Sequence, residues 1–130
     1  MRNIDSIIVH CSATKAGQDF TATDIDRWHR ERGFNGIGYH YVVRLDGKLE
    51  KGRDVSLAGA HCKGWNKRSI GICYIGCSVR DTVEKSRMRT DIRQILGQMF
   101  KNGCFIRLLW ICSGNIIFSK CWDIGILHRI

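Results

Sequence analysis

The chain contains no proline in 130 residues, where average usage would give roughly six, and this excludes any site that needs a proline turn. It contains no apolar run of about 18 residues, the length that a membrane-spanning helix requires, so no contact with a membrane is expected. It also has no secretory signal, because Asp5 and Ser6 stand where the apolar segment of such a signal would lie. We therefore expect a chain that is cytoplasmic as synthesised.

Cysteine and basic residues are plentiful, but neither forms a recognisable framework. The seven cysteines are an odd number, and without an export signal reduced thiols are favoured over a disulfide network. Lys and Arg number 21 against 12 Asp and Glu, a formal net charge of +9, which suits polyanionic partners in general. Nucleic acid is not the expected partner, because the basic residues are not clustered and no stacking aromatic motif accompanies them.

Length and composition indicate one globular domain, residues 1–130, and a monomer is expected. Apolar residues make up 44% of the chain and charged residues 25%, an ordinary balance for a folded protein. A chain of this length can bury a single core but is too short for two.

The first 76 residues predict an α/β fold, with a mixed central β-sheet flanked by helices. Ile4–His10 has the β-branched composition of a buried strand. Thr23 as N-cap, with Asp26 at the third helical position and Gly33 as the stop, predicts a helix of about ten residues.

Two further strands and a hairpin follow this helix. Tyr39–Arg44 predicts a strand, and Asp46-Gly47 is the strongest hairpin signal in the chain. Ser69–Ile75 alternates small and large side chains, which suits a central strand packed on both faces.

The signals change beyond Gly76. Phe105–Cys112 and residues 116–118 are candidate strands, and Thr90 is a candidate cap for a helix that would end at Gly103. The apolar stripe of this helix indicates a core-facing surface and not a site: Ile92, Ile95, Leu96, Met99 and Phe100.

Three polar residues near the ends of the predicted elements are candidates for a site. His10 ends a buried strand, a natural place for a first metal ligand; Tyr39 begins a strand, and His61 lies in a loop. Taken singly, each is more often structural, as a hydrogen-bonded histidine, a tyrosine that anchors a strand and a loop histidine without a task. Only their combination supports a functional interpretation.

The stretch from about Ile4 to Gly76 closely resembles the zinc-dependent N-acetylmuramoyl-L-alanine amidases of the phage lysozyme type, which share their fold with peptidoglycan recognition proteins. The motifs that carry the resemblance lie in register, and together they are far more specific than any one alone. They are Val9-His10-Cys11-Ser12-Ala13-Thr14, Trp28-His29, Gly36-Ile37-Gly38-Tyr39-His40, Asp46-Gly47, Gly52-Arg53 and the stretch from Asn66 to Gly76.

The resemblance implies an enzyme that acts on peptidoglycan at the cell wall, if the protein is released, and cuts the bond between N-acetylmuramic acid and L-alanine. His10 matches the first zinc ligand, and Tyr39 matches the tyrosine whose hydroxyl lies beside the scissile carbonyl. His61, Asn66 and His40 are carried over as residues that bind the muropeptide. An open-site Zn²⁺ supplies the nucleophile and the charge stabilisation that amide hydrolysis needs at neutral pH, and a nearby phenol can donate to the developing oxyanion.

The half of the family's site that completes the zinc is missing from the sequence. The family uses a histidine in a Gly-His-Arg-Asp segment and a Cys or Asp soon after it, and this chain has no such segment and no Cys-Pro turn. His128 with Cys121 or Cys112 could substitute, but without support from the family. We therefore expect weak zinc binding and weak or no hydrolysis, and the alternative function is a non-catalytic muropeptide-binding module.

A shift of reading frame near Cys77 offers a cause for the missing half. In a shifted frame, the codon junctions from Trp122 to Ile126 permit Gly-His-Arg-Asp at the place where the family has it. We hypothesise that residues 77–130 are a shifted translation of the zinc-completing half. Sequencing the gene across the codons for Ile75 to Val79 tests this, and an intact frame with no longer alternative would contradict it.

Overall fold

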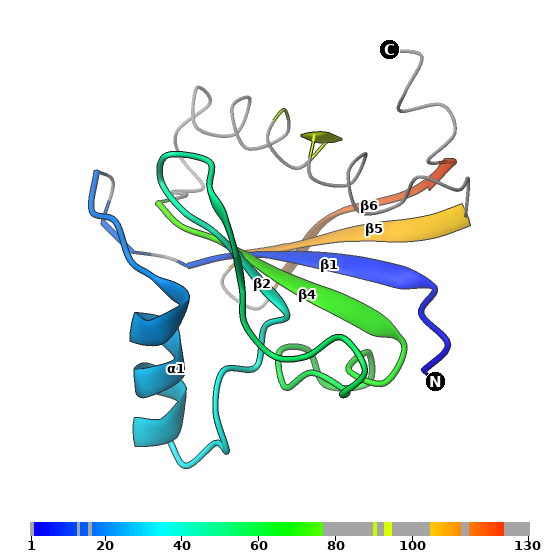
Figure 1. Ribbon diagram of the computed structural model, residues 1–130. Helices are drawn as coiled ribbons and strands as arrows, with labels where there is room; N and C mark the ends of the chain where they lie inside the picture. The colour runs from blue at the N-terminus through cyan, green and yellow to red at the C-terminus, as the bar shows by residue number, and fades with distance from the viewer. Residues whose placement is uncertain are drawn as a thin grey trace.

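The computed structural model describes residues 2–12, 14–15, 17–76, 90, 93–94, 105–112 and 115–123. A six-stranded sheet dominates this part of the chain, and helix α1 (Ala22–Glu31) stands beside it (Figure 1). In spatial order the strands are β3 (Leu49–Lys51), β2 (Tyr41–Val43), β4 (Ser69–Tyr74), β1 (Ser6–Cys11), β5 (Phe105–Cys112) and β6 (Asn115–Asp123).

The sheet is mixed, which confirms the predicted fold class. β1 runs parallel to both of its neighbours, β4 and β5, and β2 runs parallel to β4. The edge strands β3 and β6 are antiparallel to β2 and β5 respectively. The two strands that the sequence analysis expected to be buried, β1 and β4, therefore lie side by side at the centre.

β1 and β4 are packed on both faces. Successive side chains of a strand point to opposite faces, and β4 has small residues at Ser69, Gly71 and Cys73 and larger ones between them. Its whole length is buried, as predicted for a central strand. The register pairs Gly71 with Ile8 and Cys73 with His10, so the small side chains of β4 lie on the same face as His10 and leave room above it.

Helix α1 covers one end of this face. Ile25, the buried residue of the helix, lies in one core cluster with Val42 of β2 and Cys73 of β4. Trp28 packs against the same cluster. The helix therefore faces the side of the sheet that carries His10.

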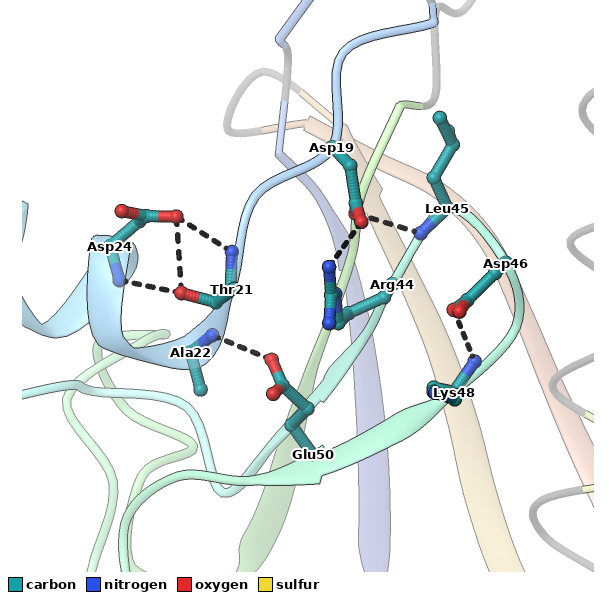
Figure 2. Close-up of polar contacts among 9 residues, drawn as sticks. All are labelled: Asp19, Thr21, Ala22, Asp24, Arg44, Leu45, Asp46, Lys48 and Glu50. Atoms are coloured by element: carbon teal, nitrogen blue, oxygen red, sulfur yellow. Dashed lines mark hydrogen bonds and ion pairs between the residues drawn. The ribbon is translucent and has the colours of Figure 1, made fainter.

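The helix begins two residues earlier than the sequence analysis predicted. Its N-cap is Thr21, whose hydroxyl accepts from the Asp24 backbone N–H at 3.2 Å, while the Asp24 carboxylate accepts from the Thr21 N–H at 2.9 Å (Figure 2). This reciprocal arrangement is a capping box. Thr23, the predicted cap, lies inside the first turn. Asp26 is engaged elsewhere, because its carboxylate accepts from the backbone N–H of Ile37 at 2.8 Å.

The predicted stop of the helix is confirmed. The last helical residue is Glu31, Arg32 is the C-cap, and Gly33 follows with a φ of +92°. Glycine reaches this left-handed conformation without the steric cost that other residues meet.

The hairpin predicted at Asp46-Gly47 is confirmed and is fastened to the start of α1. Gly47 has a φ of +87°, and the strands on either side of the turn, β2 and β3, pair antiparallel. Asp19 pairs with Arg44 at the end of β2, and Glu50 of β3 accepts from the Ala22 backbone N–H at 2.9 Å (Figure 2). These contacts fix the helix start against the sheet edge.

The predictions for the second half have mixed outcomes. The strands predicted at Phe105–Cys112 and residues 116–118 are confirmed as β5 and as part of β6. Arg93 and Gln94 are helical, as predicted, whereas Thr90, the predicted cap, is itself helical. The apolar stripe of that helix and Gly103 lie outside the described residues. No helix in the part of the chain that the structure describes has the length and apolarity to cross a bilayer.

Candidate functional site

His10, Tyr39 and His61 come together on the face of the sheet that the small residues of β4 leave open. The ring centroids of His10 and Tyr39 are 5.1 Å apart, those of His10 and His61 are 5.0 Å apart, and those of Tyr39 and His61 are 6.2 Å apart. His10 Nε2 and His61 Nδ1 are hydrogen bonded at 2.9 Å. His10 and Tyr39 therefore lie on one side of the sheet, since both rings contact the His61 ring.

The small residues of β4 create the space that His61 occupies. A Cβ atom added at Gly71 would lie 2.5 to 2.7 Å from three atoms of the His61 imidazole, and one added at Gly59 would lie 2.5 Å from its Cδ2. Real Cβ atoms essentially never approach that closely. The Ser69 hydroxyl lies at the end of the ring, 3.3 Å from Nε2. The ring therefore lies directly on the glycine backbone.

The loop that carries His61 is held in shape by Asn66. The Asn66 Oδ1 accepts from the backbone N–H groups of His61 and Cys62, each at 2.9 Å. We predicted that Asn66 binds substrate, and this placement leaves only its amide nitrogen for that contact. Its evident task is to fix the backbone on which His61 stands.

His40, also predicted to bind substrate, is placed as a structural residue. Its side chain is 0% exposed. Its Nδ1 accepts from the Gly71 backbone N–H at 3.0 Å, so Nε2 carries the proton and donates to the Leu57 carbonyl at 2.8 Å. Both ring nitrogens are thus engaged inside the protein, which argues against the predicted direct contact with substrate.

Tyr39 is held from the other side by the end of helix α1. His29 in the last turn of α1 accepts from the Gly38 backbone N–H at 2.9 Å through its Nδ1, and its ring lies 5.4 Å from the Tyr39 ring. Burial raises the pKa of the Tyr39 phenol. The phenol therefore keeps its proton and can act as a hydrogen-bond donor.

Burial keeps the two site histidines neutral. It lowers the pKa of His10 from 6.5 to about 4 and that of His61 to about 3, where the neighbouring His10, His40 and Arg2 contribute as well. His10 is 7% exposed. At neutral pH both imidazoles have a lone pair, the form in which histidine ligates metals.

The described residues supply one fitting zinc ligand but not a complete set. His10 is neutral, and its Nε2 is bonded to a neighbour that fixes the ring, as is usual for metal-ligating histidines. A zinc site needs about three protein ligands. Among the residues whose side chains are described, no group of three or more His, Cys, Asp or Glu could hold a metal ion.

Of the substitutes named from the sequence, Cys121 lies far from His10 in the sheet. Cys121 pairs with Arg107, which pairs with Ser6, whereas His10 pairs with Ile111. Four residues along the strands and two strands across separate Cys121 from His10 by roughly 16 Å, which is far beyond the reach of one metal ion. Cys112 ends β5 next to Ile111, and His128 lies outside the described residues.

Three residues of the site were not found from the sequence. Ser69 and Gly71 lie within a predicted buried strand and belong to no motif that indicates a site, and only the packing of the loop on β4 reveals them. Arg2 joins the amino-terminal segment to this region, because its guanidinium donates to the carbonyl oxygens of Val55, Asn66 and Ser69. The alternation of small residues in β4 was the only signal that could have indicated the pocket for His61.

Proteins of known structure share this fold. LysC, an N-acetylmuramoyl-L-alanine amidase from Clostridium intestinale, superposes with a TM-score of 0.65 and 26% identity, over 94% of this chain and 78% of that chain. A variant of Drosophila PGRP-LB in complex with tracheal cytotoxin superposes with a TM-score of 0.71 and 25% identity, over 85% of this chain and 70% of that chain. Both confirm the predicted amidase and peptidoglycan-recognition-like architecture.

Sequence comparison gives the same relationship. The endolysin of Escherichia phage T7 is 47% identical over 72 residues, which is 55% of this chain and 48% of the endolysin, so the chain spans about half the length of the relatives it matches. A family model described as N-acetylmuramoyl-L-alanine amidase matches residues 1–103. This match extends beyond Gly76, where the resemblance seen in the sequence motifs ends. Because this match covers most of the sequence and the fold agrees with it, the chain belongs to the N-acetylmuramoyl-L-alanine amidase family.

Proposed function

We propose that this protein acts on peptidoglycan by hydrolysing the amide bond between N-acetylmuramic acid and L-alanine, in a zinc-dependent reaction that its incomplete set of zinc ligands weakens. The observation that supports this most strongly is the contact of His10 with Tyr39 and His61 on one face of the sheet. Membership of the amidase family and the amidase LysC among the structural neighbours agree with it. A net charge of +9 is compatible with an anionic cell-wall polymer.

Each residue of the cluster has a task in this reaction. Zinc, when bound, would polarise the scissile carbonyl and activate water. His10 offers one neutral imidazole nitrogen to the metal. The protonated phenol of Tyr39 can donate a hydrogen bond to the carbonyl oxygen as negative charge develops on it. His61 fixes the His10 ring through the 2.9 Å bond and lines the same face.

A second candidate function is muropeptide binding without catalysis. It is favoured by the incomplete metal site, since the described side chains hold no group of three metal ligands. The neighbour PGRP-LB is seen with tracheal cytotoxin bound. A fold of this type with an incomplete metal site could still hold a muropeptide in its groove.

Zinc content and turnover, measured on the same purified protein, separate the two candidates. Zinc stoichiometry is measured by elemental analysis, and hydrolysis by dye release from labelled cell walls with and without added zinc. Tyr39→Phe removes the proposed donor and should lower turnover roughly 100- to 1,000-fold. Tyr41→Phe is the matched control, because Tyr41 pairs with Ile72 and lies on the opposite face of the sheet from His10.

The outcomes discriminate clearly. Bound zinc with turnover that disappears in His10→Ala and in Tyr39→Phe, but not in Tyr41→Phe, supports the amidase. No turnover, with retention on insoluble peptidoglycan that weakens in His61→Ala, supports the binding module. A protein that neither hydrolyses nor retains peptidoglycan would contradict both candidates.

A further inference from the structure

A chain of hydrogen bonds runs from the Trp65 carbonyl through Ser69 and His61 to His10. The Ser69 hydroxyl lies 2.7 Å from the Trp65 carbonyl oxygen and 3.3 Å from Nε2 of His61. Nδ1 of His61 lies 2.9 Å from Nε2 of His10. Of these four groups only the carbonyl has a fixed role, because a carbonyl oxygen can accept a hydrogen bond but never donate one.

The fixed role of the carbonyl sets the direction of every bond in the chain. A hydroxyl has a single proton, so Ser69 donates it to Trp65 and must accept from the Nε2–H of His61. A neutral imidazole with its proton on Nε2 has its lone pair on Nδ1, so His61 accepts from the Nε2–H of His10. His10 is thereby the Nε2–H tautomer, and its remaining lone pair lies on Nδ1.

The surroundings of the two rings support this assignment. His61 lies against the backbone at Gly59 and Gly71, which fixes the plane of its ring. In the described part of the chain, no hydrogen bond engages Nδ1 of His10. This nitrogen is therefore the one that His10 can offer to a ligand.

We infer that Ser69 and His61 are positioning residues that hold His10 in the Nε2–H tautomer and so present its Nδ1 to a metal ion. The identity of the ion, zinc, rests on the proposed function. The tautomer does not, because the hydrogen bonds set it in the metal-free protein. Histidines that ligate metals usually donate their other ring N–H to an acceptor that fixes tautomer and orientation, and here that acceptor is Nδ1 of His61.

Nuclear magnetic resonance of the full chain without metal tests the tautomer directly. Two-bond ¹H–¹⁵N correlations of ¹⁵N-labelled protein distinguish the two neutral forms of an imidazole. The spectrum is recorded near pH 8.5, roughly two units above the ordinary histidine pKa, so that both rings are neutral. We expect the Nε2–H pattern for both His10 and His61. The Nδ1–H pattern at either residue would overturn the inference.

Substitution of Ser69 tests the start of the chain. Ser69→Ala removes the acceptor of the His61 Nε2–H, and loss of one hydrogen bond should shift the tautomer ratio of His61 roughly tenfold toward Nδ1–H. His10 should shift with it, because the bond between the two rings then reverses. Ser69→Thr keeps a hydroxyl and should retain the wild-type pattern. An unchanged His10 pattern in folded Ser69→Ala would show that Ser69 does not position it.

Ser56→Ala is the matched control. Its hydroxyl donates to Asp54 at 2.6 Å in an exposed loop, so its loss should leave the patterns of His10 and His61 unchanged. If Ser69→Ala fails to fold, the wild-type spectrum still decides the direction of the bonds.

Addition of zinc chloride to the labelled wild-type protein separates this inference from the proposed function. A response at Nδ1 of His10 supports the inference, and a response at Nε2 contradicts it. The absence of any response, with the Nε2–H tautomer present, would count against the zinc of the proposed function and leave the tautomer assignment supported. Conversely, turnover by a protein with the opposite tautomer would refute only the present inference.

Discussion

Gly71 is the position at which one added carbon atom tests the architecture of the site most directly. The Cβ of an alanine there would lie 2.5, 2.6 and 2.7 Å from Cδ2, Cγ and Nε2 of His61, whereas ordinary contacts begin at 3.4 Å. The His61 ring must therefore retreat by about 1 Å. Gly71 does not have a positive φ, so alanine introduces no backbone strain and the whole effect comes from the clash with His61.

The expected loss of stability follows from two contributions. Overpacking of this kind costs about 1 to 3 kcal/mol. Retreat of the ring also stretches the bonds of His61 to His10 and Ser69. Each is worth about 1 kcal/mol, and losing about half of each adds about 1 kcal/mol. Gly71→Ala should therefore lower the free energy of unfolding by about 2 to 4 kcal/mol, a large part of the 5 to 15 kcal/mol typical of a domain.

A double-mutant cycle with His61→Ala measures the clash itself. Without the imidazole, Gly71→Ala should be nearly neutral or stabilising by about 0.5 to 1 kcal/mol, because glycine in a strand is less favourable than alanine. Urea unfolding of the four proteins then gives a coupling free energy of about 2 kcal/mol or more.

Gly52→Ala is the control for this cycle. Its Cβ would meet the Tyr39 backbone oxygen at 2.5 Å and not His61, so its cost should be the same in both backgrounds. Equal costs of Gly71→Ala with and without His61 would show that the ring does not lie on Gly71, and the geometry of the site would be wrong.

Three further predictions concern the cap, the loop and the site histidines. Thr21→Ala should lower the free energy of unfolding in urea by about 1 kcal/mol, because it removes the capping box. Thr23→Ala should change it by less than about 0.5 kcal/mol, and the reverse order would contradict the assignment of the cap. Asn66→Ala leaves two backbone N–H groups without their acceptor and should lower the free energy of unfolding by about 1 to 3 kcal/mol. Asn66→Asp keeps an acceptor oxygen and should lower it less. Equal losses for the two variants would show that Oδ1 does not hold the loop. Burial lowers the pKa of His10 from 6.5 to about 4 and that of His61 from 6.5 to about 3. Below about pH 6.5 the unfolded chain therefore binds more protons than the folded one. The stability that the neutral rings contribute is complete above that pH and is lost as the pH falls toward 3. Urea midpoints across this range measure the effect, and a loss that persists unchanged in His10→Ala and in His61→Ala would refute its assignment to these rings.

The sequence predicted the elements whose signals are local. Ile4–His10 was expected as a strand and β1 spans Ser6–Cys11, and the turn at Asp46-Gly47 and the central strand were placed correctly. The helix start was wrong because the sequence offers two capping boxes in succession, Thr21 with Asp24 and Thr23 with Asp26. A contact between residues apart in sequence distinguishes them, because the Asp26 carboxylate accepts from the backbone N–H of Ile37 and does not cap the helix.

The site was predictable only in its most distinctive residues. His10, Tyr39 and His61 could be named because motifs in register identify the family. The geometry that brings them together depends on a loop that folds back onto β4, so that Ser69 and Gly71 contact the His61 ring. For the same reason the sequence did not reveal that the buried ring of His40 holds the backbone at Gly71.

The register of the sheet places a condition on the frame-shift hypothesis. The codon junctions that permit Gly-His-Arg-Asp begin at Trp122, which pairs with Ile106 near the start of β5, whereas His10 pairs with Ile111 near the end of that strand. Five residues along the strands amount to roughly 17 Å, and zinc ligands must lie within about 2.3 Å of the metal. A histidine read from the other frame at this point of the chain could therefore not share a metal with His10 while β6 keeps its present pairing. Both β5 and β6 lie within the tail that the hypothesis replaces. If the shifted frame does encode the missing ligands, the restored chain must therefore pair differently over residues 105–123, and the antiparallel contact between β5 and β6 must be a consequence of the present tail.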